Sequence, residues 1–168
     1  MTAQQGIWPD LHIRVGQGFD IHPFSDDPGR RLVLGGVVFE NERGLVGHSD
    51  SDVIAHACTD ALLGAAGLGD IGMHFPDTAA EFAGADSVML LETAASRVHD
   101  AGWTPQNIDC SVVLEAPKLA PHRKAMQERL SEAAGAPVTI KGKRAEGLGA
   151  LGRREGIACW AAALVIGS

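Results

Sequence analysis

Cysteine is scarce in this sequence, and long apolar runs are missing. Only Cys58, Cys110 and Cys159 occur among 168 residues, far apart and in apolar or alternating segments. An odd number of scattered thiols favours reduced core residues over disulfides or a cysteine-based zinc site. No apolar run reaches the roughly 20 residues of a membrane-spanning helix, and the N-terminus lacks the basic and apolar regions of a secretory signal. We therefore expect a cytoplasmic protein that does not bind or cross membranes.

Positive charge is also in the minority, with 14 lysines and arginines against 21 acidic residues and a net charge of −7. Nucleic acids require a basic surface that neutralises phosphates, so we expect no nucleic-acid partner. An anionic small molecule is compatible with this charge only where metals or a few local cations reverse the field. The length predicts one domain over residues 12–168, preceded by a short tail over residues 1–11.

The hydrophobic patterns predict strands and helices that alternate without a regular repeat. Four long strands are expected at residues 12–22, 107–115, 138–140 and 156–166, and two short ones over residues 32–39 with a bend at two glycines. The last strand is continuously apolar, which indicates burial on both faces or an interface. Helices are expected from Ser51 or Asp52 to the glycines at 64–69, from Asp86 to Gly102, and from Pro121, in a first helical turn, to Gly135. We predict an α+β fold, mainly a four-stranded sheet with helices packed on one face, plus a small hairpin.

Acids and histidines recur in two segments, at the spacing that places them on one side of a helix or of a strand. Asp52, His56 and Asp60 are four residues apart, so they share one face of the predicted helix. Asp20 and His22 are two residues apart and point to the same side of the first strand, where neighbouring glycines allow another segment to come close. Zinc binds histidine nitrogen and carboxylate oxygen, and three protein ligands leave a position for substrate. By itself this pattern leaves a metal site and ordinary core or surface histidines both open.

Six motifs occur in order along the chain. They are GFDIH at 18–22, HSDSDV at 48–53, HACTDAL at 56–62, GDIG at 69–72 with FPD at 75–77, APK at 116–118 and GRREG at 152–156. Together they resemble the family of 2-C-methyl-D-erythritol 2,4-cyclodiphosphate synthases, and the resemblance runs over residues 14–166. The fold that it implies is a homotrimer around a central apolar cavity, with active sites between subunits. The activity that it implies is a lyase reaction of the non-mevalonate isoprenoid pathway, in which 4-diphosphocytidyl-2-C-methyl-D-erythritol 2-phosphate yields the cyclic diphosphate and CMP.

The resemblance also implies metal and substrate ligands, with no protein nucleophile. Zinc, or another divalent transition metal, would bind Asp20, His22 and His56, and Glu146 would help to hold Mg²⁺ or Mn²⁺. Cations and positioning suit this chemistry, because two phosphate groups of one molecule must be brought together. His48 and Ser49 match positions that contact the 2-phosphate. The methylerythritol would be held by Asp70, Ile71, Gly72, Phe75 and Asp77.

The cytidine diphosphate part of the substrate would lie against two further segments. They comprise Leu114, Ala116, Pro117, Lys118, Leu119 and Ala120, and then Gly142, Lys143 and Arg144. Lys143 and Arg144 depart from the family, which usually has threonines there. They either form charge-assisted hydrogen bonds to the diphosphate, crowd the diphosphate clamp, or belong to a solvated basic turn. Arg153 and Glu155 match a pair near the threefold axis, where the central cavity can take an isoprenoid diphosphate.

Three questions stay open at this point. Asp52 and Asp60 either orient His56 or a neighbouring loop, or they cap the helix and face solvent. A zinc hydrolase that activates water is an alternative activity, with Asp70 or Asp77 as its base. A catalytically idle, zinc-stabilised interaction module is an alternative outside the enzymes.

Overall fold

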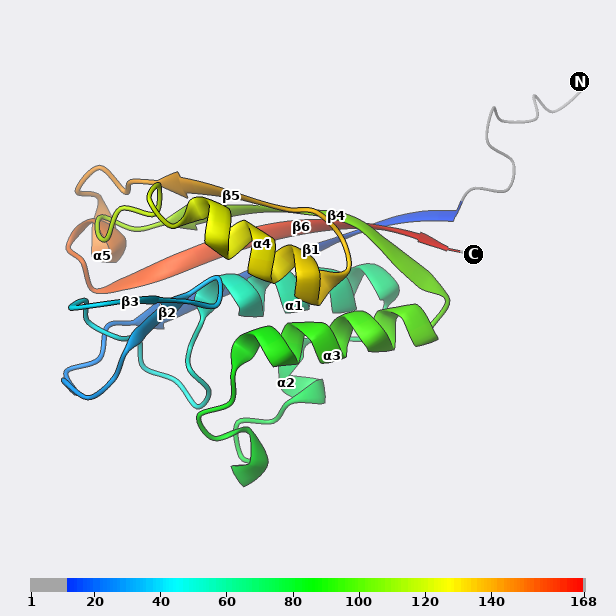
Figure 1. Ribbon diagram of the computed structural model, residues 1–168, viewed down its shortest axis with the longest axis horizontal. Coiled ribbons are helices and arrows are strands. Elements are labelled where there is room, and N and C mark those ends of the chain that lie inside the picture. The colour runs from blue at the N-terminus through cyan, green and yellow to red at the C-terminus, as the bar shows by residue number, and fades with distance from the viewer. Residues whose placement is uncertain (1–11, 168) are drawn as a thin grey trace, which may run out of the picture.

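A four-stranded mixed sheet with its long helices on one face forms the body of the protein (Figure 1). The structure, a computed structural model, describes residues 12–167; the predicted tail over residues 1–11 lies outside the described residues. The strand order is β1-β6-β4-β5, in which β6 pairs antiparallel with both neighbours and β4 pairs parallel with β5. The predicted α+β class and four-stranded sheet are confirmed. The sheet strands are β1 (His12–Pro23), β4 (Trp103–Val113), β5 (Val138–Lys143) and β6 (Gly156–Gly167).

The remaining elements are one hairpin and several helices. The hairpin turns at Gly35 and Gly36, both of which have positive φ, as the predicted glycine bend requires. Figure 1 shows α1, α3 and α4 side by side under one face of the sheet. The elements are β2 (Leu32–Leu34), β3 (Val37–Phe39), α1 (Val53–Ala66), α2 (Ile71–His74), the 3₁₀ turn η1 (Ala80–Phe82), α3 (Ser87–Asp100), α4 (Arg123–Ala134) and α5 (Gly149–Gly152).

Predicted boundaries were wrong in β4, β5 and the third helix, and β4 also ends at Val113 rather than residue 115. β4 begins at Trp103 rather than residue 107, because its pairing with β6 continues past a register shift between Pro105 and Asn107. β5 continues to Lys143, since residues 141–143 still pair with β4. The third helix, α4, does not include Pro121 in its first turn. The amide of His122 donates to the carbonyl of Leu119 at 3.0 Å, and this turn precedes the helix, which begins at residue 123.

The two faces of the sheet differ in burial. Apolar side chains of the inner face, with those of the helices, form the core, and all three cysteines are buried in it, as predicted for core residues. On the outer face Trp160 of β6 is 40% exposed, so this strand is not buried on both faces within one chain. Large apolar side chains exposed on the same face of β1 are Ile13, Val15, Phe19 and Ile21.

Two glycines of β1 set how closely α1 lies against the sheet. A Cβ atom on Gly16 would lie 2.0 Å from the carbonyl oxygen of Ala61, and one on Gly18 would lie 1.9 Å from that of Ala57. Any side chain there would therefore displace the helix. Direct backbone contact, as expected from the glycines, places the first turns of α1 beside the end of β1 that carries Asp20 and His22. Within residues 12–167, no helix combines the length and the apolar character needed to cross a bilayer.

Candidate metal centre and substrate cavity

Asp20, His22 and His56 converge where β1 meets the start of α1. The Oδ2 atom of Asp20 lies 3.0 Å from His22 Nε2 and 3.0 Å from His56 Nδ1. The two ring nitrogens lie 3.3 Å apart. These are the residues within the described range whose ligand atoms, all within 4.8 Å of one another, could hold a metal ion. The predicted trio is therefore brought together in space.

The ionised carboxylate of Asp20 is the charge in this cluster that suits a divalent cation, and it also attracts a proton to His56 when no cation is bound. Burial raises the pKa of Asp20, but hydrogen bonds and charges of His22 and His56 outweigh it and lower that pKa to about 2. Burial lowers the pKa of His56, but the hydrogen bond and charge of Asp20 outweigh it and raise that pKa. A carboxylate and two imidazoles whose lone pairs point at one place form a donor set that zinc and related metals accept. The residues present therefore fit the metal that the sequence predicts.

The outer nitrogen of His56 is held by a chain of hydrogen bonds from another helix. His56 Nε2 lies 2.8 Å from Ser87 Oγ and 3.0 Å from Ser49 Oγ. The hydroxyl of Ser87 donates to Asp50 Oδ1, and its backbone amide donates to Asp50 Oδ2 at 3.2 Å. When Nδ1 faces a metal, Nε2 carries the proton and donates it to a hydroxyl. Such partners fix the orientation of the ring. The sequence predicted only that a helix begins near Ser87, and it indicated no role for Asp50 at this site.

Replacing Ser87 by alanine is expected to weaken metal binding about 10- to 100-fold, because His56 would lose its link to the Asp50 carboxylate. Competition with a chromophoric chelator measures the affinity. Thr93→Ala is the matched control, since that hydroxyl lies on the same helix and bonds to the carbonyl of Met89. Equal affinities for Ser87→Ala and the control would show that Ser87 does not orient His56.

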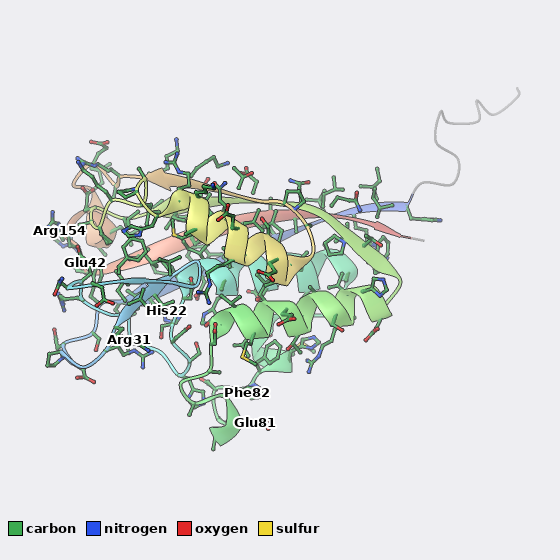
Figure 2. All side chains as sticks on the ribbon, in the orientation of Figure 1. His22, Arg31, Glu42, Glu81, Phe82 and Arg154 are labelled. Atoms are coloured by element: carbon green, nitrogen blue, oxygen red, sulfur yellow. The ribbon has the colours of Figure 1, made fainter. Side chains whose placement is uncertain are left out.

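A cavity of about 400 Å³ opens above the metal cluster. His22 and Phe82, which line it from β1 and η1, are labelled in Figure 2. Asp70 is not among the lining residues of the described chain; it caps α2, where its carboxylate accepts the amide of Met73 at 2.9 Å. The predicted substrate residues that do line the cavity together with the metal cluster are His48, Ser49, Ile71, Gly72, Phe75 and Asp77.

Asp52 and Asp60 stabilise the frame of this cavity. Asp52 is fully buried and caps α1, so capping is confirmed and solvent exposure was wrong for this residue. Its carboxylate also accepts the amides of Gly35 and Gly36. Asp60 accepts the amide of Ile71 at 2.7 Å and so holds the loop that leads into α2. Its predicted role toward a neighbouring loop is confirmed.

A second, smaller cavity of about 180 Å³ is formed by the segments predicted to hold the nucleotide. The two cavities share no lining residue. Ala116 is not among its lining residues and precedes Pro117 through a cis peptide bond. Sequence analysis missed two charged lining residues, Glu115 and Arg123. The predicted residues that line this cavity are Leu114, Pro117, Lys118, Leu119, Ala120, Gly142, Lys143 and Arg144.

The other predicted residues lie in the segment after β5. Glu146 has a positive φ of 53° and lines neither cavity. Arg153 Nε and Glu155 Oε1 form an exposed ion pair at 2.6 Å, just before β6. The structure therefore gathers most residues predicted to bind zinc, the 2-phosphate and the sugar alcohol around one cavity and most of those predicted to bind the nucleotide around another, and Glu146 lines neither.

Comparisons with known proteins match nearly the whole chain. The model of the YgbB family matches residues 13–166. A 2-C-methyl-D-erythritol 2,4-cyclodiphosphate synthase of Paraburkholderia phymatum is 54% identical over 159 residues, which cover 93% of this chain and 99% of that protein.

Two solved structures share the fold. The bifunctional IspDF from Campylobacter jejuni superimposes with a TM-score of 0.89 and 40% identity; the match covers 95% of this chain and 44% of that longer protein. The CDP complex of IspF from Plasmodium falciparum superimposes with a TM-score of 0.79 and 34% identity, covering 93% of this chain and 97% of that one.

Proposed function

This chain belongs to the YgbB family, and we propose on that premise how its residues carry out the cyclodiphosphate synthase reaction for which its relatives are named. The chain has the activity of a phosphorus–oxygen lyase that releases CMP. In this reaction an oxygen of the substrate's 2-phosphate forms a bond to the β-phosphorus of the diphosphate. The bond from that phosphorus to the bridging oxygen breaks, and the oxygen leaves with CMP. The observation that carries the proposal is the convergence of Asp20, His22 and His56 beside a cavity lined by residues 71–77.

The candidate metal ligands lie beside the cavity of the reacting phosphate. Asp20, His22 and His56 would hold zinc or another divalent transition metal, which when bound would supply Lewis-acid activation of a phosphate oxygen. Asp20 stays ionised because its pKa lies near 2, so the centre keeps its anionic ligand at neutral pH. Ser87 and Asp50 keep the ring of His56 aimed at the cluster.

The large cavity positions the methylerythritol 2-phosphate. His48 lies at its rim, where Nε2 lies 3.0 Å from the carbonyl of Ala79, and Ser49 lies beside the metal cluster. These two residues contact the 2-phosphate. Asp77 and the backbone of Ile71 and Gly72 bond to the sugar-alcohol hydroxyls, because a carboxylate accepts from hydroxyls and glycine lets the backbone approach. Asp70 contributes by holding α2 in place.

The small cavity takes the cytidine diphosphate part. Four cations surround it, and they offset the charge of a diphosphate although the chain as a whole is acidic. Two of them lie where the family usually has threonines, which favours charge-assisted hydrogen bonds to the diphosphate in this chain. Glu146 would help to hold Mg²⁺ or Mn²⁺, because magnesium combines few carboxylates with phosphate oxygens. The four cations are Lys118, Arg123, Lys143 and Arg144.

A homotrimer with active sites between subunits completes the proposal. Two observations support it: the two cavities share no lining residue, and the outer face of the sheet exposes Phe19, Trp160 and other large apolar side chains. Exposed apolar surface of this kind marks interaction sites. Association through this face would bring one chain's small cavity to its neighbour's large cavity. Arg153 and Glu155 would then face a central apolar cavity that accepts an isoprenoid diphosphate.

The decisive experiment incubates the protein with the diphosphocytidyl substrate and Mg²⁺, with and without a zinc chelator. We expect CMP and cyclic product in equal amounts, and loss of both on chelation while circular dichroism shows a retained fold. Free phosphate without CMP would favour the zinc hydrolase. No CMP, combined with unfolding on chelation, would favour the interaction module.

A further inference from the structure

Arg97 of α3 reaches across to the segment that forms one wall of the large cavity. Its Nη1 atom lies 2.5 Å from His74 Nδ1, at the end of α2. The guanidinium also lies over the ring of Phe75, with Cζ 5.0 Å from the ring centroid. Phe75 lines the cavity and is only 8% exposed. One arginine, 22 or more positions along the chain from both residues, therefore contacts them together.

The hydrogen bonds of His74 admit one arrangement of protons. Arginine can only donate, so Nδ1 of His74 must accept. The proton of the neutral ring is therefore on Nε2, which donates to the carbonyl oxygen of Leu68 at 2.8 Å. Arg97, His74 and Leu68 thus form a directional chain of hydrogen bonds that closes the loop before α2 against α3.

This chain of contacts fixes the wall of the cavity from behind. The amide of Phe75 donates to the carbonyl of Ile71 at 2.8 Å, and the ring of Phe75 packs edge-on against Phe82 at 5.4 Å. Asp60 holds the other end of the short helix through the amide of Ile71. The cavity side of α2 is thereby attached at both ends, to α1 by Asp60 and to α3 by Arg97.

We propose that Arg97 and His74 are positioning residues, which set the shape of the large cavity for the methylerythritol part of the substrate without touching it. This inference rests on the proposed function. It assigns the two residues to the sugar-alcohol half of the site alone, because both contact Phe75, which lines the large cavity, and neither lines the cavity that takes the nucleotide. Loss of the contact should therefore weaken binding of the whole substrate and leave binding of CDP alone unchanged.

The test compares Arg97→Met, Arg97→Lys and His74→Phe with the wild-type protein. Methionine keeps an apolar stem and removes the donor, lysine keeps a cationic donor, and phenylalanine keeps a ring and removes both hydrogen bonds. We expect KM for the full substrate to rise about tenfold in Arg97→Met and His74→Phe, with kcat changed less than about twofold, and Arg97→Lys to restore most of the loss. The dissociation constant for CDP should stay at the wild-type value. Arg129→Met, the same change on the exposed side of α4, is the control.

The possible results separate the positioning role from the proposed function. An unchanged KM in either folded variant, or a CDP affinity that falls together with KM, would overturn the positioning role. Thermal unfolding is measured first, and if Arg97→Met is unfolded at the assay temperature, His74→Phe decides by the same criterion. A wild-type protein that releases no CMP would refute the proposed function, before any variant is compared. Normal wild-type turnover with unaltered variants would refute this inference alone.

Discussion

Asp20→Ala is expected to lower turnover on the order of 1000-fold while the protein stays folded. The Oδ2 atom of Asp20 is the anionic member of the metal cluster and lies 3.0 Å from a nitrogen of each histidine. Without it two neutral imidazoles remain, and a divalent cation at the site has no charge-neutralising ligand. The side chain is 23% exposed at the cavity wall, so its removal opens no void in the core.

Three measurements on the same sample check this expectation: CMP release, bound metal, and the circular dichroism spectrum. Asp26→Ala is the matched control, because it deletes a fully exposed carboxylate whose partner is Arg43 at 2.8 Å. Asp20→Ala should lose metal and turnover together, and the control should lose neither. A metal-free Asp20→Ala protein with more than about a tenth of wild-type turnover would remove the metal centre from the mechanism.

Asp52→Ala is expected to lower the free energy of unfolding by about 3–5 kcal/mol. Asp52 is fully buried, and its two carboxylate oxygens accept four backbone amides. Two of these amides begin α1, and two belong to the turn between β2 and β3. Alanine would leave these donors without partners, and each such group costs about 1–3 kcal/mol where water cannot replace the partner.

Urea unfolding measures this loss, with Asp86→Ala as the control. Asp86 is also a helix N-cap, but it is exposed and accepts only the amide of Val88, so its removal should cost about 1 kcal/mol. A similar loss in both variants would mean that the link from α1 to the hairpin contributes little.

The raised pKa of Asp52 also implies that the stability of the protein depends on pH. Burial and the charge of Asp50 raise its pKa from 3.8 to about 6, against the hydrogen bonds from Gly36, Gly35 and Ala55. The folded protein therefore binds the proton more tightly than the unfolded chain. The resulting stabilisation is complete below pH 3.8 and is lost as the pH rises through 6. When the free energy of unfolding is measured against pH, the Asp52→Asn variant should lack the part of the slope that Asp52 contributes.

The convergence of the candidate metal ligands was predictable because regular spacing brings them to one side of their elements. Alternation on a strand placed Asp20 beside His22, and family motifs added His56. The positions of Ser87 and Arg97 were not predictable in this way. Ser87 is 31 residues from His56, and Arg97 is 23 residues from His74, so their contacts depend on how α3 packs. In the sequence Ser87 is typical of a helix cap and Arg97 of a solvated helix end.

Much of the fold was predictable for the same reason, and the errors in the prediction are confined to the ends of elements. Glycines at 35 and 36 and at the end of α1 mark turns that only small residues adopt easily, and the structure places turns there. Pro121 was misread, because a proline suits a β-turn as well as a first helical turn. Only the hydrogen bond from His122 to Leu119 distinguishes the two, and it is a property of the folded chain.

The glycines of β1 have a consequence for how this protein tolerates sequence change. Since Gly16 and Gly18 let α1 rest on main-chain atoms, no side-chain volume lies between the strand with Asp20 and the helix with His56. The distance between these ligands is therefore independent of which apolar residues fill the core elsewhere. Related chains can exchange core side chains over evolutionary time and keep the same arrangement of these ligands, provided that both positions remain glycine.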